Sequence, residues 1–253
     1  MSSADDGTGE RYFFVHVRKT GGTSFDKMLR RVFPPESCYP TDADVARNRR
    51  TYPDVTPEIC DFIRLPPDRL RGIRLVSGHY PPIAGRLLPE PPRYLTFLRH
   101  PMARTISHLR HARHFVPQFR DLSLSQILEL RRERELFFRN HQTLMFSYRS
   151  MEEACRVDDV VVPDRSRLQL AKETLVRCDF VGIFEFLADS IRLCECRFGW
   201  DLGAIPHEQR SPAEFTADTS LEERIRPLVE LDLELYEFAC GVFSEMRARY
   251  VPR

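Results

Sequence analysis

The chain has 253 residues, which suits one large domain or one domain with an appended lobe. Hydrophobic residues make up 42% of it, enough for a sizeable core, and this argues against wholesale disorder. Its 38 basic and 37 acidic residues nearly cancel to a net charge of +1. That balance argues against a nucleic-acid partner and against a polybasic membrane anchor, so any anion site must be local.

The seven cysteines are scattered and include no CxxC pair, so neither a zinc site nor a disulfide framework is supported. We expect mostly buried thiols in a reducing compartment. Residues 1–10 are polar and acidic, unlike a signal peptide, and we expect them to be disordered. No apolar run approaches the roughly 18 residues of a membrane-spanning helix. The sequence therefore indicates a cytoplasmic protein with no membrane span and one domain over 11–253.

The first predicted element is a strand over 12–17, YFFVHV, which is aromatic and β-branched and is closed by glycines. Apolar residues then follow at helical spacing until a pair of prolines, which predicts a helix that Thr23 or Ser24 caps. Residues 36–68 carry prolines and charges without clear periodicity. They predict a loop with a short helix.

Three further strands are predicted at 73–79, 93–99 and 178–185. Pro101 suits the first position of a helix that runs to residue 115. The other helices are predicted over 123–148, 165–177, 186–198 and 220–249. Strands that alternate with helices indicate an α/β, three-layer sandwich: a central parallel sheet of about four to five strands, helices on both faces, and a helical C-terminal part.

Ligands of such sheets bind at the carboxyl ends of the strands. At the carboxyl end of the first predicted strand, the chain enters the turn 19–24, KTGGTS. Gly21 and Gly22 let the backbone approach an anion closely, and Lys19 adds a positive charge. The hydroxyl donors of the turn are Thr20, Thr23 and Ser24. The turn predicts an anion site. The alternative is a plain turn in which glycines relieve crowding.

A second anion site is predicted after the third long strand, in LRHPMARTISH. Arg99 stands at the strand end, and Ser107 stands about two helical turns further on, with Arg104 between them. A guanidinium and a hydroxyl there suit a phosphate. The alternative is a surface arginine and a serine bonded to its own helix.

Several nucleotide-binding signatures are absent from the sequence. There is no GxxxxGK[ST], no strand ends in the aspartate that holds magnesium in ATP and GTP hydrolases, and no cysteine has an arginine six residues later. Two phosphate-type sites without a magnesium acid indicate a doubly phosphorylated nucleotide. Such a nucleotide would be used for something other than phosphoryl transfer.

The same segments resemble the PAPS-dependent sulfotransferases. FFVHVRKTGGTSF resembles their 5′-phosphosulfate loop, especially in the carbohydrate-type branch of heparan-sulfate 2-O-sulfotransferase-like and bacterial enzymes. YLTFLRHPMARTISHLR is similar to their 3′-phosphate motif, and VSGHYP to a Gly-His stretch whose histidine is the catalytic base. The resemblance covers most of residues 11–249.

This resemblance implies a P-loop-like fold and sulfuryl transfer from PAPS to a hydroxyl of a carbohydrate, lipid-linked or small-molecule acceptor, with PAP as product and no metal. Lys19 would stabilise the leaving oxygen, and His79 would be the base, with His16 as the other candidate. The cofactor-binding residues would be Lys19, Thr20, Gly21, Gly22, Thr23, Ser24, Arg99, Ser107 and Arg210.

Two residues depart from the family pattern. Arg18 stands where proline is frequent and His100 where an acid is common. Two other functions stay open from the residues alone, a nucleotide kinase of the P-loop class and a non-catalytic module that binds 3′-phosphonucleotides. The identity of the acceptor and the oligomeric state have no signature in the sequence.

Overall fold

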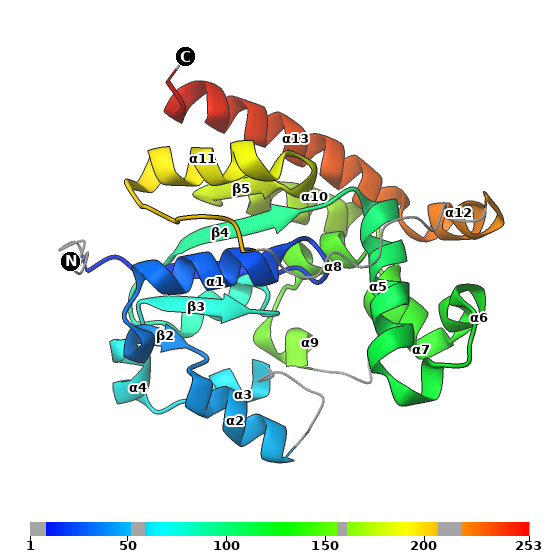
Figure 1. The fold of residues 1–253 in the computed structure, drawn as a ribbon, viewed down its shortest axis with the longest axis horizontal. Helices are drawn as coiled ribbons and strands as arrows, with labels where there is room; N and C mark the ends of the chain where they lie inside the picture. Colours follow the sequence, from blue (N-terminus) through cyan, green and yellow to red (C-terminus); the bar gives the residue numbers. More distant parts are fainter. Residues whose placement is uncertain (1–8, 52–58, 156–160, 207–218, 253) are drawn as a thin grey trace.

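The centre of the fold is a five-stranded parallel sheet (Figure 1). The computed structural model describes residues 9–51, 59–155, 161–206 and 219–252. The strand order is β2-β3-β1-β4-β5, so the first strand of the chain lies in the middle of the sheet. The strands are β1 (Tyr12–Val15), β2 (Cys38–Tyr39), β3 (Leu75–Gly78), β4 (Arg93–Leu98) and β5 (Phe180–Ile183).

The strands are apolar because helices cover the sheet on both faces. All residues of β1 and β5 are buried. Phe25 of α1 (Gly22–Val32) packs its ring 5.0 Å from that of Phe14 in β1, centroid to centroid. The same ring lies 4.8 Å from Phe97 of β4 and 5.7 Å from Phe180 of β5. The apolar runs that predicted strands therefore form the core of the molecule.

The helices form the outer layers. In Figure 1, α1 lies in front of the sheet and α8 and α10 lie behind it. The predicted α/β class with a parallel sheet and helices on both faces is confirmed. The helices are α1 (Gly22–Val32), α2 (Asp42–Thr51), α3 (Ile59–Ile63), α4 (Pro67–Gly72), α5 (Pro101–Phe115), α6 (Leu124–Glu129), α7 (Arg131–Glu133), α8 (His141–Ser147), α9 (Met151–Cys155), α10 (Arg165–Val176), α11 (Leu187–Phe198), α12 (Thr219–Ile225) and α13 (Glu230–Tyr250), with a π-helix η4 at Arg134–Phe138.

A second, smaller hydrophobic core lies beside the sheet, where α5, α6, η4 and α12 meet (Figure 1). Its fully buried residues include Leu109, Ile127, Phe138 and Ile225. Because α5 starts at the carboxyl end of β4 and ends in this second core, it connects the two cores.

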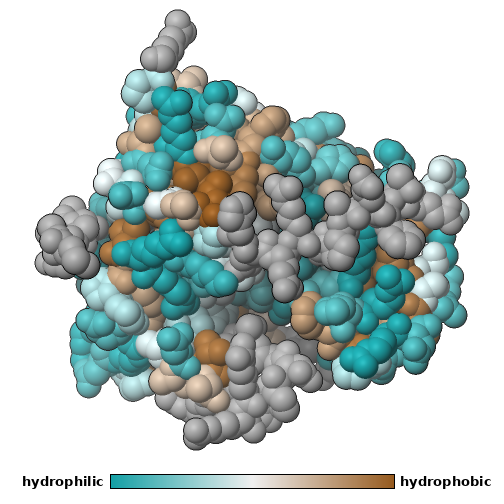
Figure 2. All heavy atoms as spheres, in the orientation of Figure 1, coloured by the Kyte–Doolittle hydropathy of each residue, from teal (hydrophilic) through white to brown (hydrophobic). Residues whose placement is uncertain are grey.

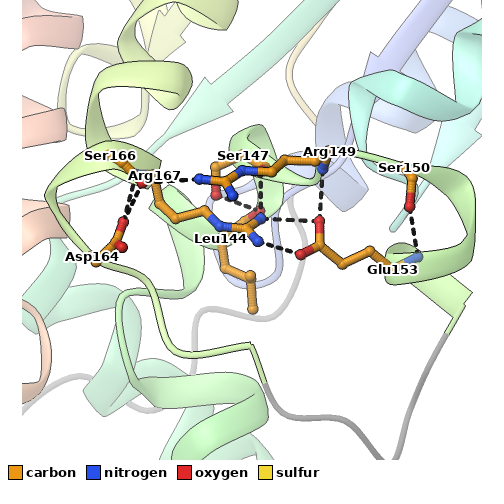
Figure 3. A network of polar contacts seen from close by, with 8 residues as sticks. All are labelled: Leu144, Ser147, Arg149, Ser150, Glu153, Asp164, Ser166 and Arg167. Carbon is orange, nitrogen blue, oxygen red and sulfur yellow. Dashed lines mark hydrogen bonds and ion pairs between the residues drawn. The ribbon is translucent and has the colours of Figure 1, made fainter.

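An ion pair between Arg167 and Glu153 joins α10 to α9 (Figure 3). Nη1 of Arg167 donates to Oε2 of Glu153 (3.0 Å) and to the carbonyl of Ser147 (2.7 Å). Asp164 caps α10 by accepting from the Arg167 N–H (2.9 Å). Arg167 is buried, so these acceptors keep its charge paired. The network fixes how α8, α9 and α10 pack together.

The prediction of one helix over 123–148 is wrong. A capping box between Ser123 and Gln126 starts α6, but Leu130 has an extended backbone and ends it. Asn140, with φ of 42°, then separates η4 from α8. The short helices face different cores: α6 and η4 contribute to the second core, whereas α8 is buried throughout and contributes Met145 and Phe146 to the main core. Spacing alone does not reveal the breaks between them.

Residues 36–68 contain more regular structure than the predicted loop with one short helix. They hold β2, α2 and α3, and the start of α4, while residues 52–58 lie outside the described part of the chain. β2 has two residues, Cys38 and Tyr39, paired with Leu75 and Val76 of β3. A strand this short is below the length at which alternation can be recognised.

The apolar face of the C-terminal helix α13 packs onto the sheet, which settles where that face is buried. Leu235, Ala239 and Phe243 belong to the main core, and α13 contacts β5 directly. On the side of the molecule shown in Figure 2, hydrophilic residues dominate among the coloured atoms and the brown areas are small. Among the described residues, no helix is both long and apolar enough to cross a membrane.

The N-terminal residues and the cysteines were also subjects of prediction. The disorder predicted for 1–10 falls mostly on residues 1–8, which lie outside the described residues, whereas Glu10 accepts a hydrogen bond from Arg93 (2.9 Å). All seven cysteines are free thiols. Three of them, Cys38, Cys178 and Cys194, are buried, and Cys196 is exposed.

Candidate functional site

The carboxyl ends of β1, β3 and β4 meet at one edge of the sheet. Val15 of β1 pairs with Gly78 of β3 and with Thr96 of β4, so the residues that follow these strands emerge side by side. Nη1 of Arg99, after β4, donates to the carbonyl of Lys19, after β1 (3.3 Å). The structure therefore brings the two predicted anion-binding segments together.

The turn between β1 and α1 has an unusual backbone. Lys19 has φ of 69° and Gly21 has φ of 81°, so two of three consecutive residues are left-handed. The hydroxyl of the fully buried Thr20 donates to the carbonyl of Val17 (2.9 Å) and braces the turn from inside. A lysine in this conformation is strained, and strain of this kind concentrates at functional sites.

Both glycines of the turn lie against aromatic rings. A Cβ on Gly21 would lie 2.4 Å from the ring of Phe184, and a Cβ on Gly22 would lie 2.1 Å from the ring of His16. Packing alone therefore requires both glycines, as the plain-turn alternative expects. The case for an anion site depends on the groups around the turn.

Gly22→Ala is expected to destabilise the protein by roughly 1–3 kcal/mol, because Gly22 already has a helical backbone and the added methyl group overpacks it against His16. The measurement is the free energy of unfolding in urea. Gly241→Ala is the matched control, since nothing lies within 4 Å of its Cβ position in α13, and it should stabilise by about 0.5–1 kcal/mol. Equal effects of the two changes would contradict the packing described here.

The N-terminus of α1 faces the turn without a side-chain cap. Its N-cap is Gly21, so the predicted cap by Thr23 or Ser24 is wrong: both lie inside the first turn of the helix. Thr23 is exposed and Ser24 partly exposed, and the first turn holds no acidic residue. Uncapped N–H groups and the positive end of the helix dipole attract an anion.

His79 follows β3 and lies against the turn. Its Nδ1 is 2.6 Å from the carbonyl of His16, and the two rings are 4.5 Å apart, centroid to centroid. Since a carbonyl only accepts hydrogen bonds, Nδ1 of His79 carries the hydrogen and Nε2 keeps its lone pair when the ring is neutral. The neutral His79 ring can therefore accept a proton on Nε2.

Burial and neighbouring cations keep both histidines neutral. Burial lowers the pKa of His79 well below its usual value, and the charge of Arg18 lowers it further. Burial lowers the pKa of His16 to about 3, helped by Arg18 and Lys19. Each imidazole therefore has a lone pair at neutral pH that can accept a proton.

Arg99 is held by a reciprocal pair of hydrogen bonds. The backbone N–H of Arg99 donates to Oε1 of Gln142 (3.1 Å), and Nε2 of Gln142 donates to the carbonyl of Arg99 (2.9 Å). We call this pair of hydrogen bonds the Gln142 clamp. The guanidinium lies 4.4 Å from the ring centre of Phe184. Burial lowers its pKa, and within the described chain its buried Nε has no hydrogen-bond partner. An oxyanion would supply that missing acceptor.

Gln142 is itself positioned by α13. Asp232 of α13 accepts from the N–H of Gln142 (3.1 Å) and of Thr143 (2.7 Å) at the start of α8. Oδ1 of Asn140 accepts in return from the N–H groups of Leu231 (3.0 Å) and Asp232 (3.1 Å). The starts of α8 and α13 therefore cap each other, and this capping positions Gln142 to bond the backbone of Arg99.

Of the other predicted residues, Ser107 and Arg104 have no hydrogen bond to the turn within the described part of the chain. Ser107 is partly exposed on α5. Arg104, which lies between Arg99 and Ser107 in sequence, is fully buried, and its Nη2 donates to the carbonyl of Phe137 (2.6 Å). Arg210 lies outside the described residues. In the described ranges, no group of three or more His, Cys, Asp and Glu side chains is placed to hold a metal ion.

Neither Glu185 nor Tyr236 was predicted from the sequence to belong to the site. Glu185 follows β5, and its Oε1 accepts from the N–H of His100 (2.9 Å) while Oε2 accepts from the hydroxyl of Tyr236 (2.9 Å). Its charge also raises the pKa of Arg99 against the effect of burial. Glu185 is the last residue of the strand predicted over 178–185, and its position at a strand end was the available signal.

The chain resembles a solved structure but no family model or curated protein. No family model matches the chain, and no curated protein matches it. Among solved structures, the chain is similar to the crystal structure of a sulfotransferase from Alicyclobacillus acidocaldarius, with 17% identity and a TM-score of 0.45. The match covers 89% of this chain and 96% of that one. A likeness at this level supports no argument about activity.

Proposed function

We propose that the chain transfers a sulfuryl group from PAPS to a hydroxyl of an acceptor and releases PAP. The observation that carries this proposal is the meeting of Lys19, His79 and Arg99 at the ends of three adjacent strands. They supply a cation at a helix N-terminus, a neutral imidazole and a guanidinium within one edge of the sheet. The acceptor is a carbohydrate, a lipid-linked molecule or a small molecule.

The 5′-phosphosulfate fits the N-terminus of α1. The helix start has no side-chain cap and no acidic residue in its first turn, so its N–H groups suit an anion. Thr20 contributes by bracing the turn through its bond to Val17. The residues we assign to this group are Lys19, Thr20, Gly21, Gly22, Thr23 and Ser24.

The 3′-phosphate fits Arg99. Its buried Nε lacks a partner among the described residues, and the Gln142 clamp fixes the backbone from which its guanidinium extends. Ser107 on α5 is the proposed second donor, and Arg210 stays a proposed contact that lies outside the described residues. A preference for nucleotides with a 3′-phosphate would follow from this pair.

The roles of the two catalytic residues follow from charge. PAPS supplies a sulfuryl group whose bridging oxygen gains negative charge as its bond to sulfur breaks. Lys19 stabilises that charge, which acts on the transition state rather than only on binding. His79 takes the proton of the acceptor hydroxyl on Nε2 as the hydroxyl attacks in line, and its Nδ1–H bond to His16 holds the ring in place. The proposed reaction uses no metal.

Arg99→Ala is expected to weaken PAP binding by about 10-fold to 100-fold, since hydrogen bonds to charged groups contribute roughly 1.5–3 kcal/mol. Isothermal titration with PAP, AMP and ATP in the absence of magnesium measures this. The wild type should bind PAP far more tightly than AMP or ATP, and the variant should lose that preference. Arg113→Ala, an exposed arginine of α5, is the matched control.

The same titration separates the alternatives. Equal or absent binding of all three nucleotides would contradict the proposal. Tight PAP binding without sulfation of any acceptor would favour a non-catalytic nucleotide-binding module. A preference for ATP that appears with magnesium would favour a kinase.

A further inference from the structure

Four cationic or titratable side chains gather around Phe137 of the π-helix η4. The guanidinium of Arg18 lies 5.6 Å from the centre of the Phe137 ring, and the imidazoles of His108 and His141 lie 5.3 Å and 6.4 Å from it. Nη2 of Arg104 donates to the Phe137 carbonyl (2.6 Å). We call Arg18, Arg104, His108 and His141 the Phe137 cluster. π-Helices are rare and often occur at functional sites.

The cluster holds several buried polar atoms without a protein partner. Arg104 is fully buried, and His108 and His141 are only 8% and 6% exposed. Within the described residues, four of their nitrogens make no hydrogen bond. These are Nε and Nη1 of Arg104, Nδ1 of His108 and Nε2 of His141. Buried polar atoms are nearly always paired, so these nitrogens lack partners that a bound ligand could supply.

The charges of the surrounding side chains indicate which kind of ligand the cluster would bind. Asp232 is an acidic neighbour of Arg104, but its two oxygens accept from the N–H groups of Gln142 and Thr143. Burial and the charge of Arg104 lower the pKa values of His108 and His141 far below their usual value. Nδ1 of His141 already donates to the carbonyl of Leu136 (3.1 Å), so its Nε2 can donate only after the ring gains a proton. An anion would favour that proton.

The cluster adjoins the proposed reaction site. Arg18 directly precedes Lys19 in the turn, and its guanidinium lies over the Phe137 ring, so it spans from the turn to the cluster. In keeping with this position, its charge lowers the pKa of His79, His108 and His141. The charge of His141 acts on His79 as well. A molecule that places a hydroxyl at His79 can therefore reach the cluster with another part of its structure.

We propose that Arg18, Arg104, His108 and His141 bind an oxyanion carried by the acceptor, a carboxylate or a sulfate, so that the acceptor is an acidic molecule. This inference depends on the proposed function in one respect: it takes the molecule that carries the oxyanion to be the acceptor of the sulfuryl group. The phosphate groups of the donor are assigned to α1 and Arg99, which leaves the cluster for the other substrate. Anchoring the oxyanion in the cluster holds the reacting hydroxyl at His79.

The test uses protein with ¹⁵N-labelled histidine, saturated with PAP so that both phosphate sites are filled. Glucuronate and methyl sulfate are the carboxylate and sulfate probes, and glucose is the neutral match for glucuronate. At pH 6.5, at least one acidic probe is expected to move the ring-nitrogen signals of His108 and His141 toward the protonated form, whereas glucose leaves them unchanged. Variants His108→Asn and His141→Asn assign the signals.

Arg18→Gln is expected to weaken binding of the responding probe at least 10-fold while PAP affinity changes less than threefold. His114→Gln, an exposed histidine of the same helix as His108, is the control and should leave probe binding unchanged. Arg18 is preferred to Arg104 because Arg104 is fully buried and its loss endangers folding.

Each outcome decides between the two proposals. If PAP binds but neither acidic probe moves the signals, or glucose moves them equally, the cluster is a polar interior and the inference is overturned. Unchanged probe binding by Arg18→Gln overturns it too. If an acidic probe binds to the cluster although PAP does not bind, the cluster stands and the proposed donor is wrong.

Discussion

Lys19→Met is expected to slow the cleavage of PAPS by roughly 10²–10³-fold, the usual loss when one donor to a developing oxyanion is removed. Lys19 has φ of 69° at the start of the turn before α1, and methionine has a side chain of similar length without the charge. The measurement is PAP release from PAPS, with water or an acceptor as the nucleophile. Because charge develops mainly in the transition state, PAP affinity should fall by much less than the rate.

Lys27→Met provides the control for that change, since Lys27 is an exposed lysine of α1, the helix whose N-terminus carries the site. It should release PAP at the wild-type rate. If Lys19→Met and Lys27→Met behave alike, or if Lys19→Met loses PAP binding as steeply as rate, Lys19 does not stabilise the leaving oxygen.

His79→Gln is expected to lower the rate of sulfuryl transfer by about 10²–10⁴-fold, as removal of a general base does. Glutamine keeps an amide that can donate toward the His16 carbonyl but offers no basic nitrogen. PAP affinity should be unchanged, because the assigned phosphate contacts come from other residues. A rate within threefold of wild type would exclude His79 as the base and direct attention to His16.

The pH dependence of wild type gives an independent check on the same residue. A base acts in its neutral form, and an ordinary histidine loses that form as the pH falls through about 6.5. The pKa of His79 is held well below that value, so the rate should stay constant as the pH falls from 8 through 6.5 and decline only at lower pH. An inflection at or above 6.5 would contradict the buried, neutral His79 described here.

The strand ends could be predicted from sequence because the signal there is local. Apolar runs closed by Lys19, His79 and Arg99 place three strands, and the rules of parallel sheets then place their carboxyl ends at one edge. The register of β1 with β3 and β4 agrees with this. The fold class and the proximity of the first turn to Arg99 follow from that pattern.

The rest of the site depends on contacts between distant segments. His100 replaces an acid common in the resembled family, and the structure places Glu185, from the end of β5, against its N–H. Arg104 is separated by 33 residues from Phe137, which lies in the π-helix η4, and a single π-helical turn has no recognisable period. Such pairs are invisible to a reading of local periodicity.

The mutual capping of α8 and α13 has a consequence for how the protein is made. Gln142 holds the end of β4 through Arg99, and Asp232 holds Gln142. The clamp therefore needs a helix whose first residue, Glu230, is translated 132 residues after Leu98, the last residue of β4. A ribosome that has finished all five strands still carries a chain without this clamp. We therefore expect the proposed affinity for nucleotide to arise only once α13 has left the exit tunnel and packed against α8.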